Sequence, residues 1–139
     1  MGVASALVFA NLGSSYGIAK SGVGIASLGV IASEKIFKAL IPIIMAGILG
    51  IYGVIVSVLL SSKAKAENQT AQDGYKNLGA GLCCGLSALA SGLAIGVAGD
   101  AGVRAYAQTD AIFVGMVLIM IFAEAIGLYG MIVAIIIMN

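Results

Sequence analysis

An all-α membrane protein of four transmembrane helices, arranged as two tandem helical hairpins, is the fold class that this sequence predicts. Hydrophobic residues make up 61% of the chain and charged residues only 9%, and the mean hydropathy is +1.14. These values lie far outside the range of soluble domains. Four apolar stretches, separated by short polar connections, are each near the roughly 20 residues that cross about 30 Å of hydrocarbon. Little of the chain is therefore expected outside the bilayer.

The predicted boundaries follow the polar connections between the apolar stretches. Pro42 suits the start of the second helix, because its missing N–H would have no partner there. The first apolar run lacks a basic start and continues past Val30, so we expect a retained helix and not a cleaved signal peptide. The predicted parts are a first hairpin at 1–61 with helices at about 3–31 and 41–60, a polar connector at 62–77, and a second hairpin at 78–139 with helices at about 78–99 and 111–138.

Small residues recur along one side of the first and third apolar stretches. Spacings of three and four residues keep such positions on one helical face. Faces of this kind let helix backbones approach closely in lipid, where the hydrophobic drive between helices is lost. We predict that these faces pack helices together through Gly13, Gly17 and Gly24 of the first stretch and Gly81, Gly85, Gly92, Gly96 and Gly99 of the third.

The second half of the chain repeats the first. Residues 17–19 (GIA) align with residues 92–94 (GLA), and residues 50–53 (GIYG) align with residues 127–130 (GLYG). The chain is therefore predicted to be an internal duplication. Because each copy contains two helices, both copies are expected to have the same orientation in the membrane.

A single carboxylate, Glu124, stands inside the apolar run that extends from Ala111 to Met138. At about 1.5 Å per residue it lies about 20 Å from either end of this run, near the bilayer midplane. A charge at that depth costs roughly 2.5 to 3.5 kcal/mol on insertion scales. The equivalent position of the first copy is Gly47, so the hairpin itself does not need an acid there. We predict that Glu124 binds and releases an ion.

A proton is the favoured ion, and sodium is the less favoured alternative. One carboxyl group is enough to bind a proton, whereas sodium needs a cage of several oxygen ligands. Hydroxyl groups within the apolar stretches are few. We take Tyr52, Ser57 and Tyr129 as possible neighbours of Glu124, with Ser87 and Ser91 as further oxygen donors, although Tyr129 lies about 140° round its helix from the acid. No cofactor and no metal site are expected.

The remaining charged and sulfur-containing residues exclude several classes of function. The net charge is only +1, and scattered lysines do not form the basic stripe of a nucleic-acid-binding protein. Adjacent Cys83 and Cys84, in a chain without histidine, lack the spacing of metal or redox motifs and are expected to be packing residues. The basic residues lie near the ends of the apolar stretches or between them, so a cation that meets Glu124 must come from another subunit. No soluble catalytic domain is apparent, and the chain is not expected to be an enzyme on its own.

Four motifs carry a resemblance to a known family. They read YGIAKSGVGI at 16–25, IPIIMAGILGIYGVIVSVL at 41–59, LASGLAIGVAGDAGVR at 89–104 and FVGMVLIMIFAEAIGLYGMIVAIII at 113–137. Together they closely resemble the proteolipid family that forms the rotor of the vacuolar-type, proton-translocating rotary ATPase (V-ATPase). The likeness covers all four apolar stretches, and a doubled hairpin with one acid is typical of the vacuolar type. Members of that family usually carry several more residues before the first stretch.

The resemblance implies a rotor ring in the membrane of a vacuole or another acidic organelle. Copies of the chain, or paralogous proteolipids, form the ring with the first and third stretches inside and the second and fourth facing lipid. The family's essential acid corresponds to Glu124, which is protonated while facing lipid and loses its proton beside an arginine of the stator membrane subunit. ATP hydrolysis elsewhere turns the ring through central-stalk subunits. The resemblance implies that the first and third connections lie in the cytosol. Charge alone leaves the orientation of the chain in the membrane open, because the connections on each side carry three basic residues.

A passive channel or a structural membrane scaffold is the alternative function. In that case the glycine-rich helices only pack, and Glu124 is a packing or hydrogen-bonding residue. Pore linings more often use rings of polar groups or constrictions formed by several helices. A lone acid in one of two copies therefore favours the proton-carrying rotor subunit.

Overall fold

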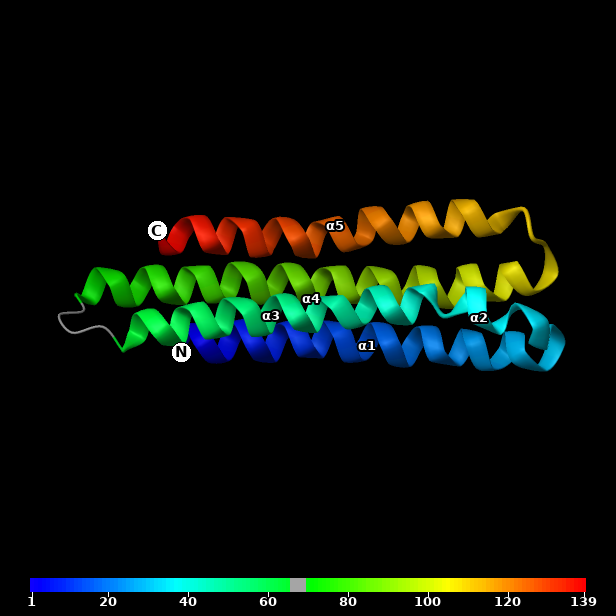
Figure 1. Cartoon of the computed structure of the whole chain (residues 1–139), viewed down its shortest axis with the longest axis horizontal. Helices are drawn as coiled ribbons and strands as arrows, with labels where there is room; N and C mark the ends of the chain where they lie inside the picture. The colour runs from blue at the N-terminus through cyan, green and yellow to red at the C-terminus, as the bar shows by residue number, and fades with distance from the viewer. Residues whose placement is uncertain (66–69) are drawn as a thin grey trace.

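The computed structural model describes residues 1–65 and 70–139 as a bundle of long helices (Figure 1). Four helical stretches of the described chain are long and apolar enough to cross a membrane, so the predicted fold class is confirmed. The middle of the predicted connector, residues 66–69, lies outside the described residues. The elements are α1 (Gly2–Ile31), η1 (Ser33–Lys35), α2 (Ile36–Ala39), α3 (Ile41–Ala64), α4 (Ala71–Gln108) and α5 (Ile112–Met138).

The long helices run side by side and form two hairpins (Figure 1). The α1–α3 and α4–α5 connections lie at one end of the bundle, whereas both chain termini lie toward the other end. Helix α1 packs most extensively on α4, while α3 lies along α1 and α5 along α4. A smaller contact joins α3 to α5. The first and third predicted spans thus form a central pair, and the second and fourth meet beside it.

The central pair is held together by the small residues of α1 and α4. A Cβ atom added to any of the eight glycines predicted for packing would come within 3.0 Å of another helix. At Gly92, for example, the added atom would collide with the backbone of Gly13, and at Gly17 it would lie 2.8 Å from the Cβ of Ala46. Backbone approach this close is the packing mode available to helices in lipid. Larger side chains at these positions would force the helices apart.

Helix α4 is longer than the helix predicted at 78–99. It begins with a capping box, in which the Thr70 hydroxyl accepts the Asp73 N–H at 3.3 Å and the Asp73 carboxylate accepts the Thr70 N–H at 3.0 Å. It continues past Asp100, whose carboxylate pairs with Arg104 one turn later at 2.7 Å and with Lys20 of α1 at 3.3 Å. With 38 residues, α4 is about 57 Å long and must project beyond the hydrocarbon core. Both ends of the connector predicted at 62–77 are also partly helical where they are described, because α3 continues to Ala64 and α4 begins at Ala71.

Candidate ion-binding site

Glu124 lies near the middle of α5, where its side chain is half-buried between helices. The hydroxyl group of Tyr52, on α3, donates a hydrogen bond to Oε1 of Glu124 at 3.3 Å. The acid and its partner therefore belong to different repeats and are brought together by the contact between α3 and α5. A phenol that reaches a carboxyl group in this way can orient it and can stabilise its charged form.

The backbone beside the acid is fixed against α4. The buried hydroxyl of Ser91 donates to the carbonyl oxygen of Ala123, the residue before Glu124, at 2.7 Å. One turn along, a Cβ added to Gly127 would lie 2.6 Å from Leu49 and 3.4 Å from Ser91. Glycine is thus needed for α5 to approach α3 and α4 at the level of the acid. Sequence reasoning identified Ser91 only as an oxygen donor, because nothing in the sequence shows which carbonyl it meets.

The three predicted neighbours have different positions in the structure. Tyr52 contacts Glu124. Ser57 is buried more than one turn beyond Tyr52 on α3 and donates its hydrogen bond to the carbonyl of Val3 at 3.0 Å. Tyr129 is 61% exposed and lies on the outer side of α5. The structure therefore brings only Tyr52, among these three, to the carboxyl group.

The position equivalent to Glu124 in the first repeat has no reactive group. A Cβ added to Gly47 would meet no atom of the described chain within 4 Å. The tyrosine of the second repeat that is equivalent to Tyr52 is Tyr129, which is exposed. One complete tyrosine–acid pair therefore exists in the described structure, and it joins the tyrosine position of repeat one to the acid position of repeat two.

The ion pairs of the described chain lie toward the helix ends and do not involve Glu124. Asp100 pairs with Lys20 and Arg104, and Lys35 pairs with Asp110 at 2.9 Å. The sequence predicts Lys20 near the end of a span and Arg104 in a connection, whereas the structure places Lys20 within α1 and Arg104 within α4. Sequence reasoning did not identify Asp100 as the partner of these two residues. Its spacing of four residues from Arg104 on one helix was the available signal. In the part of the chain that the structure describes, no cation neutralises Glu124.

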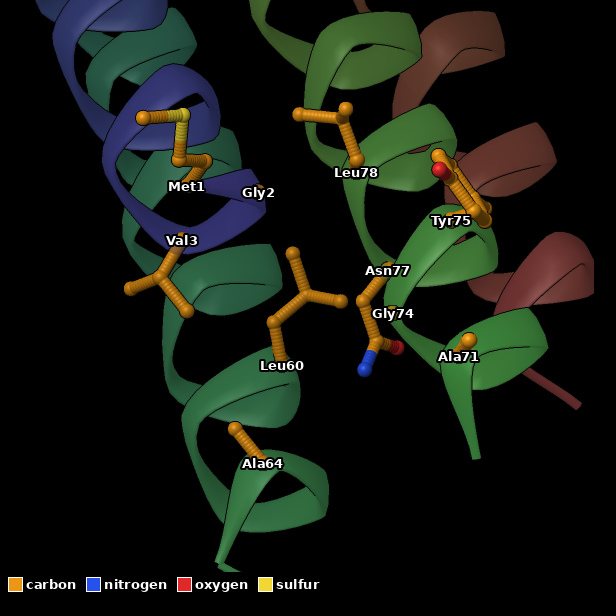
Figure 2. A pocket seen from close by; sticks show the side chains of 10 residues that line it. All are labelled: Met1, Gly2, Val3, Leu60, Ala64, Ala71, Gly74, Tyr75, Asn77 and Leu78. Atoms are coloured by element: carbon orange, nitrogen blue, oxygen red, sulfur yellow. The ribbon is translucent and has the colours of Figure 1, made fainter. Parts of the chain in front are cut away.

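A pocket of about 460 Å³ lies at the end of the bundle where α1 begins and α3 ends (Figure 2). Leu60 and Leu78 point toward its interior, and Tyr75 lies at its α4 side. None of the described residues that line it has an acidic or basic side chain. It is therefore a gap in helix packing far along the bundle from Glu124, and it adds no group to the ion-binding site.

Comparison with known proteins gives one family and several similar proteins. The model of the family described as the C subunit of ATP synthase matches residues 1–60 and 78–137. The 16 kDa proteolipid c subunit of the V-type proton ATPase of Nephrops norvegicus is 56% identical over 136 residues, which cover 97% of this chain and 86% of that protein. The protein of the same name from Ascaris suum is 55% identical over 138 residues, covering 98% and 86%. That from Homo sapiens is 53% identical over 136 residues, covering 98% and 87%.

Proposed function

The chain belongs to the family of ATP synthase C subunits, and from this premise we propose that it is a proton-carrying subunit of the rotor ring of a vacuolar-type ATPase. Its similar proteins are proteolipid c subunits of V-type proton ATPases, and its four apolar helices suit a membrane rotor. It acts as a subunit of a proton-translocating ATPase and not as an enzyme alone. Glu124 binds one proton and releases it each time the chain passes the stator.

The pairing of Glu124 with Tyr52 is the observation that carries this proposal. An acid near the bilayer midplane is costly and is by default functional, and here its carboxyl group accepts one hydroxyl hydrogen bond at 3.3 Å. That arrangement is sufficient to hold a proton. A sodium cage would need more oxygen ligands, yet of the candidate hydroxyl groups Tyr52 is the one that contacts the carboxyl group, whereas Ser57 lies against Val3 and Ser91 against the carbonyl of Ala123. The geometry therefore favours a proton over sodium.

The transport cycle follows from the two surroundings that Glu124 meets as the ring turns. Hydrocarbon favours the neutral acid, whereas a nearby cation favours the carboxylate. The ion pairs of the described chain leave Glu124 without a cation, so the cation comes from another subunit, for which we propose an arginine of the stator. ATP hydrolysis in other subunits turns the ring in one direction through the central stalk. The ring lies in the membrane of a vacuole or another acidic organelle.

Replacement of the acid tests the proposal directly. In membranes that carry the assembled complex, Glu124→Gln should abolish ATP-driven acidification, because an amide cannot carry a proton. Glu124→Asp is the matched variant: it keeps a carboxyl group on a shorter side chain and should retain part of the acidification. Ring assembly, measured by the mass of the detergent-extracted complex, should be normal for both. Undiminished acidification by Glu124→Gln would overturn the proposal and support the alternative of a passive scaffold.

Chemical labelling gives a second, independent test. A hydrophobic carbodiimide reacts with protonated carboxyl groups in the membrane, so it should modify this chain at Glu124. Mass spectrometry of the labelled peptide identifies the residue. Labelling of Asp100 or another end-located acid, with Glu124 unmodified, would contradict a protonated acid at the midplane.

A further inference from the structure

Helix α4 forms hydrogen bonds with both of the helices that supply the tyrosine–acid pair. Ser91 of α4 is fully buried, and its hydroxyl donates to the carbonyl oxygen of Ala123, one residue before Glu124, at 2.7 Å. Cys84, about two turns earlier on α4, is also fully buried, and its thiol donates to the carbonyl oxygen of Tyr52 at 3.7 Å. One helix therefore holds the backbone at both members of the pair, which belong to two other helices.

The hydroxyl of Ser91 is not needed for α5 to form. Inside an α-helix the Ala123 carbonyl accepts the N–H of Gly127, and a carbonyl oxygen can accept a second donor. A buried hydroxyl without a partner is costly, so the bond from Ser91 favours one position of α5 along and around α4. Leu49 fixes the same level from α3, because a Cβ added to Gly127 would lie 2.6 Å from Leu49 and 3.4 Å from Ser91.

The first repeat lacks this contact. The residue of α1 equivalent to Ser91 is Tyr16, whose side chain is 40% exposed. The residue of α3 equivalent to Ala123 is Ala46, which packs against Gly17. The side-chain hydroxyl groups of α1 that donate hydrogen bonds in the described chain donate to carbonyls of α1 itself. The polar contact between inner and outer helix thus accompanies Glu124 and is missing where the repeat has glycine.

We propose that Ser91 and Cys84 are positioning residues of the proton site. They hold α5 and α3 on α4 in the one register that keeps the carboxyl group of Glu124 within reach of the Tyr52 hydroxyl, 3.3 Å away. A slip of one residue would move the acid about 1.5 Å along its helix and about 100° around it, and a hydrogen bond does not tolerate such a change. This inference rests on the proton-carrying role proposed above and assigns the residues that prepare its site.

Removal of the Ser91 hydroxyl tests the proposal in membranes that carry the assembled complex. Ser91→Ala should accelerate carbodiimide labelling of Glu124 at fixed pH about two- to fivefold, because a carboxyl group that is no longer held at Tyr52 loses a hydrogen bond to its charged form. Ser57→Ala is the matched control. It deletes another buried bond between helices, from Ser57 to the carbonyl of Val3 at 3.0 Å, and should leave the labelling rate near wild type. Both variants should lower thermal stability by comparable amounts, so a loss of stability alone does not produce the expected difference.

A double variant distinguishes positioning from a general loosening of the bundle. If Ser91 acts through the contact between Tyr52 and Glu124, its removal has no further effect once the Tyr52 hydroxyl is gone. Ser91→Ala with Tyr52→Phe should therefore label at the rate of Tyr52→Phe alone, which is the non-additivity expected of residues that act as one unit. Additive acceleration would overturn the proposal. Equal labelling rates for Ser91→Ala and Ser57→Ala would overturn it as well.

The two adjacent cysteines provide a second matched pair. Cys84→Ala should also accelerate labelling of Glu124, but less than Ser91→Ala does, because a thiol is the weaker donor. Cys83→Ala should leave the rate near wild type, since its thiol donates at the same distance of 3.7 Å to Gly130, more than one turn beyond the acid. Faster labelling of Cys83→Ala than of Cys84→Ala would overturn the role of Cys84.

The wild-type chain separates failure of this inference from failure of the proposed function. Labelling of wild-type Glu124 that does not respond to Ser91→Ala or Cys84→Ala would overturn the positioning role and leave the proton-carrying role in place. Absence of labelling at wild-type Glu124 would overturn both.

Discussion

The two repeats of this chain share a packing scheme but differ in chemistry at the middle of their outer helices. Both contribute a small-residue helix to the central pair, and both place a tyrosine at the same point of an outer helix. Only the second repeat has an acid in the middle of its outer helix, because Glu124 stands where the first repeat has Gly47. Helices α3 and α5 form in both cases. The acid is therefore an addition to a hairpin that folds without it, as expected for a functional group whose burial costs stability.

Tyr52 and Tyr129 extend the comparison. They are the same residue at equivalent positions, yet Tyr52 donates a hydrogen bond to Glu124 and Tyr129 is exposed. The difference comes from what lies opposite each one, since α5 covers Tyr52 and no part of the described chain covers Tyr129. The role of each of these two tyrosines is therefore set by the helix that lies opposite it and not by its position on its own helix. This dependence can be tested by moving groups between the repeats.

Moving the acid to the other repeat should have the largest effect. Glu124→Gln alone is expected to abolish acidification. The double variant Glu124→Gln with Gly47→Glu should recover part of it, because the transferred acid lies at the equivalent depth, where a Cβ at position 47 meets no described atom within 4 Å. ATP-driven acidification and carbodiimide labelling of residue 47 are the measurements. Normal assembly with labelling but without any recovery would show that the stator distinguishes α3 from α5.

Exchanging glycines of the central helices should have the next largest effect. Gly92→Val would force a side chain into the backbone of Gly13, and overpacking of this kind costs about 1 to 3 kcal/mol or more. Gly22→Val is the matched control, because a Cβ at Gly22 meets no described atom within 4 Å and the equivalent position of the second repeat already holds Val97. Thermal stability of the detergent-extracted chain should fall for the first variant and remain near wild type for the second.

Equal losses of stability for these two variants would contradict the packing described for the central pair. In the described packing a Cβ at Gly92 meets the backbone of Gly13, whereas a Cβ at Gly22 meets nothing within 4 Å.

Much of the fold could be predicted from the sequence, because spacing and depth are local properties. The glycine spacing in the first and third stretches predicted a common face, and the structure places those glycines against a neighbouring helix. The depth of Glu124 likewise follows from counting residues along one helix. These features need no knowledge of how two distant segments align. The length of α4 was underestimated because Asp100 and Arg104 look like a polar connection until their mutual ion pair and the contact with Lys20 are known.

The surroundings of Glu124 were harder to predict, because they depend on the register between helices. Tyr52 and Tyr129 were both possible neighbours, and their helical positions could not show which one α3 and α5 bring to the acid. Ser57 was a possible neighbour by composition, yet it lies against the carbonyl of Val3. Contacts between segments some 70 residues apart are set by the packing of the whole bundle, and glycine-lined surfaces fit together in several registers.

Removal of single hydroxyl groups should have the smallest effect and gives the sharpest comparison of the repeats. Tyr52→Phe deletes the hydrogen bond to Glu124 while keeping the ring, and a hydrogen bond of this kind contributes about 0.5 to 1.5 kcal/mol. We therefore expect acidification to slow about two- to tenfold. Carbodiimide labelling of Glu124 at fixed pH should become faster, because the lost hydrogen bond stabilises the charged form of the carboxyl group and the reagent modifies the protonated form. Tyr129→Phe should have the smaller effect on both rates, because its hydroxyl meets no acid in the described chain. If Tyr129→Phe instead alters the labelling of Glu124 more than Tyr52→Phe does, the phenol that orients the acid comes from the neighbouring copy, and the proton site is completed between chains.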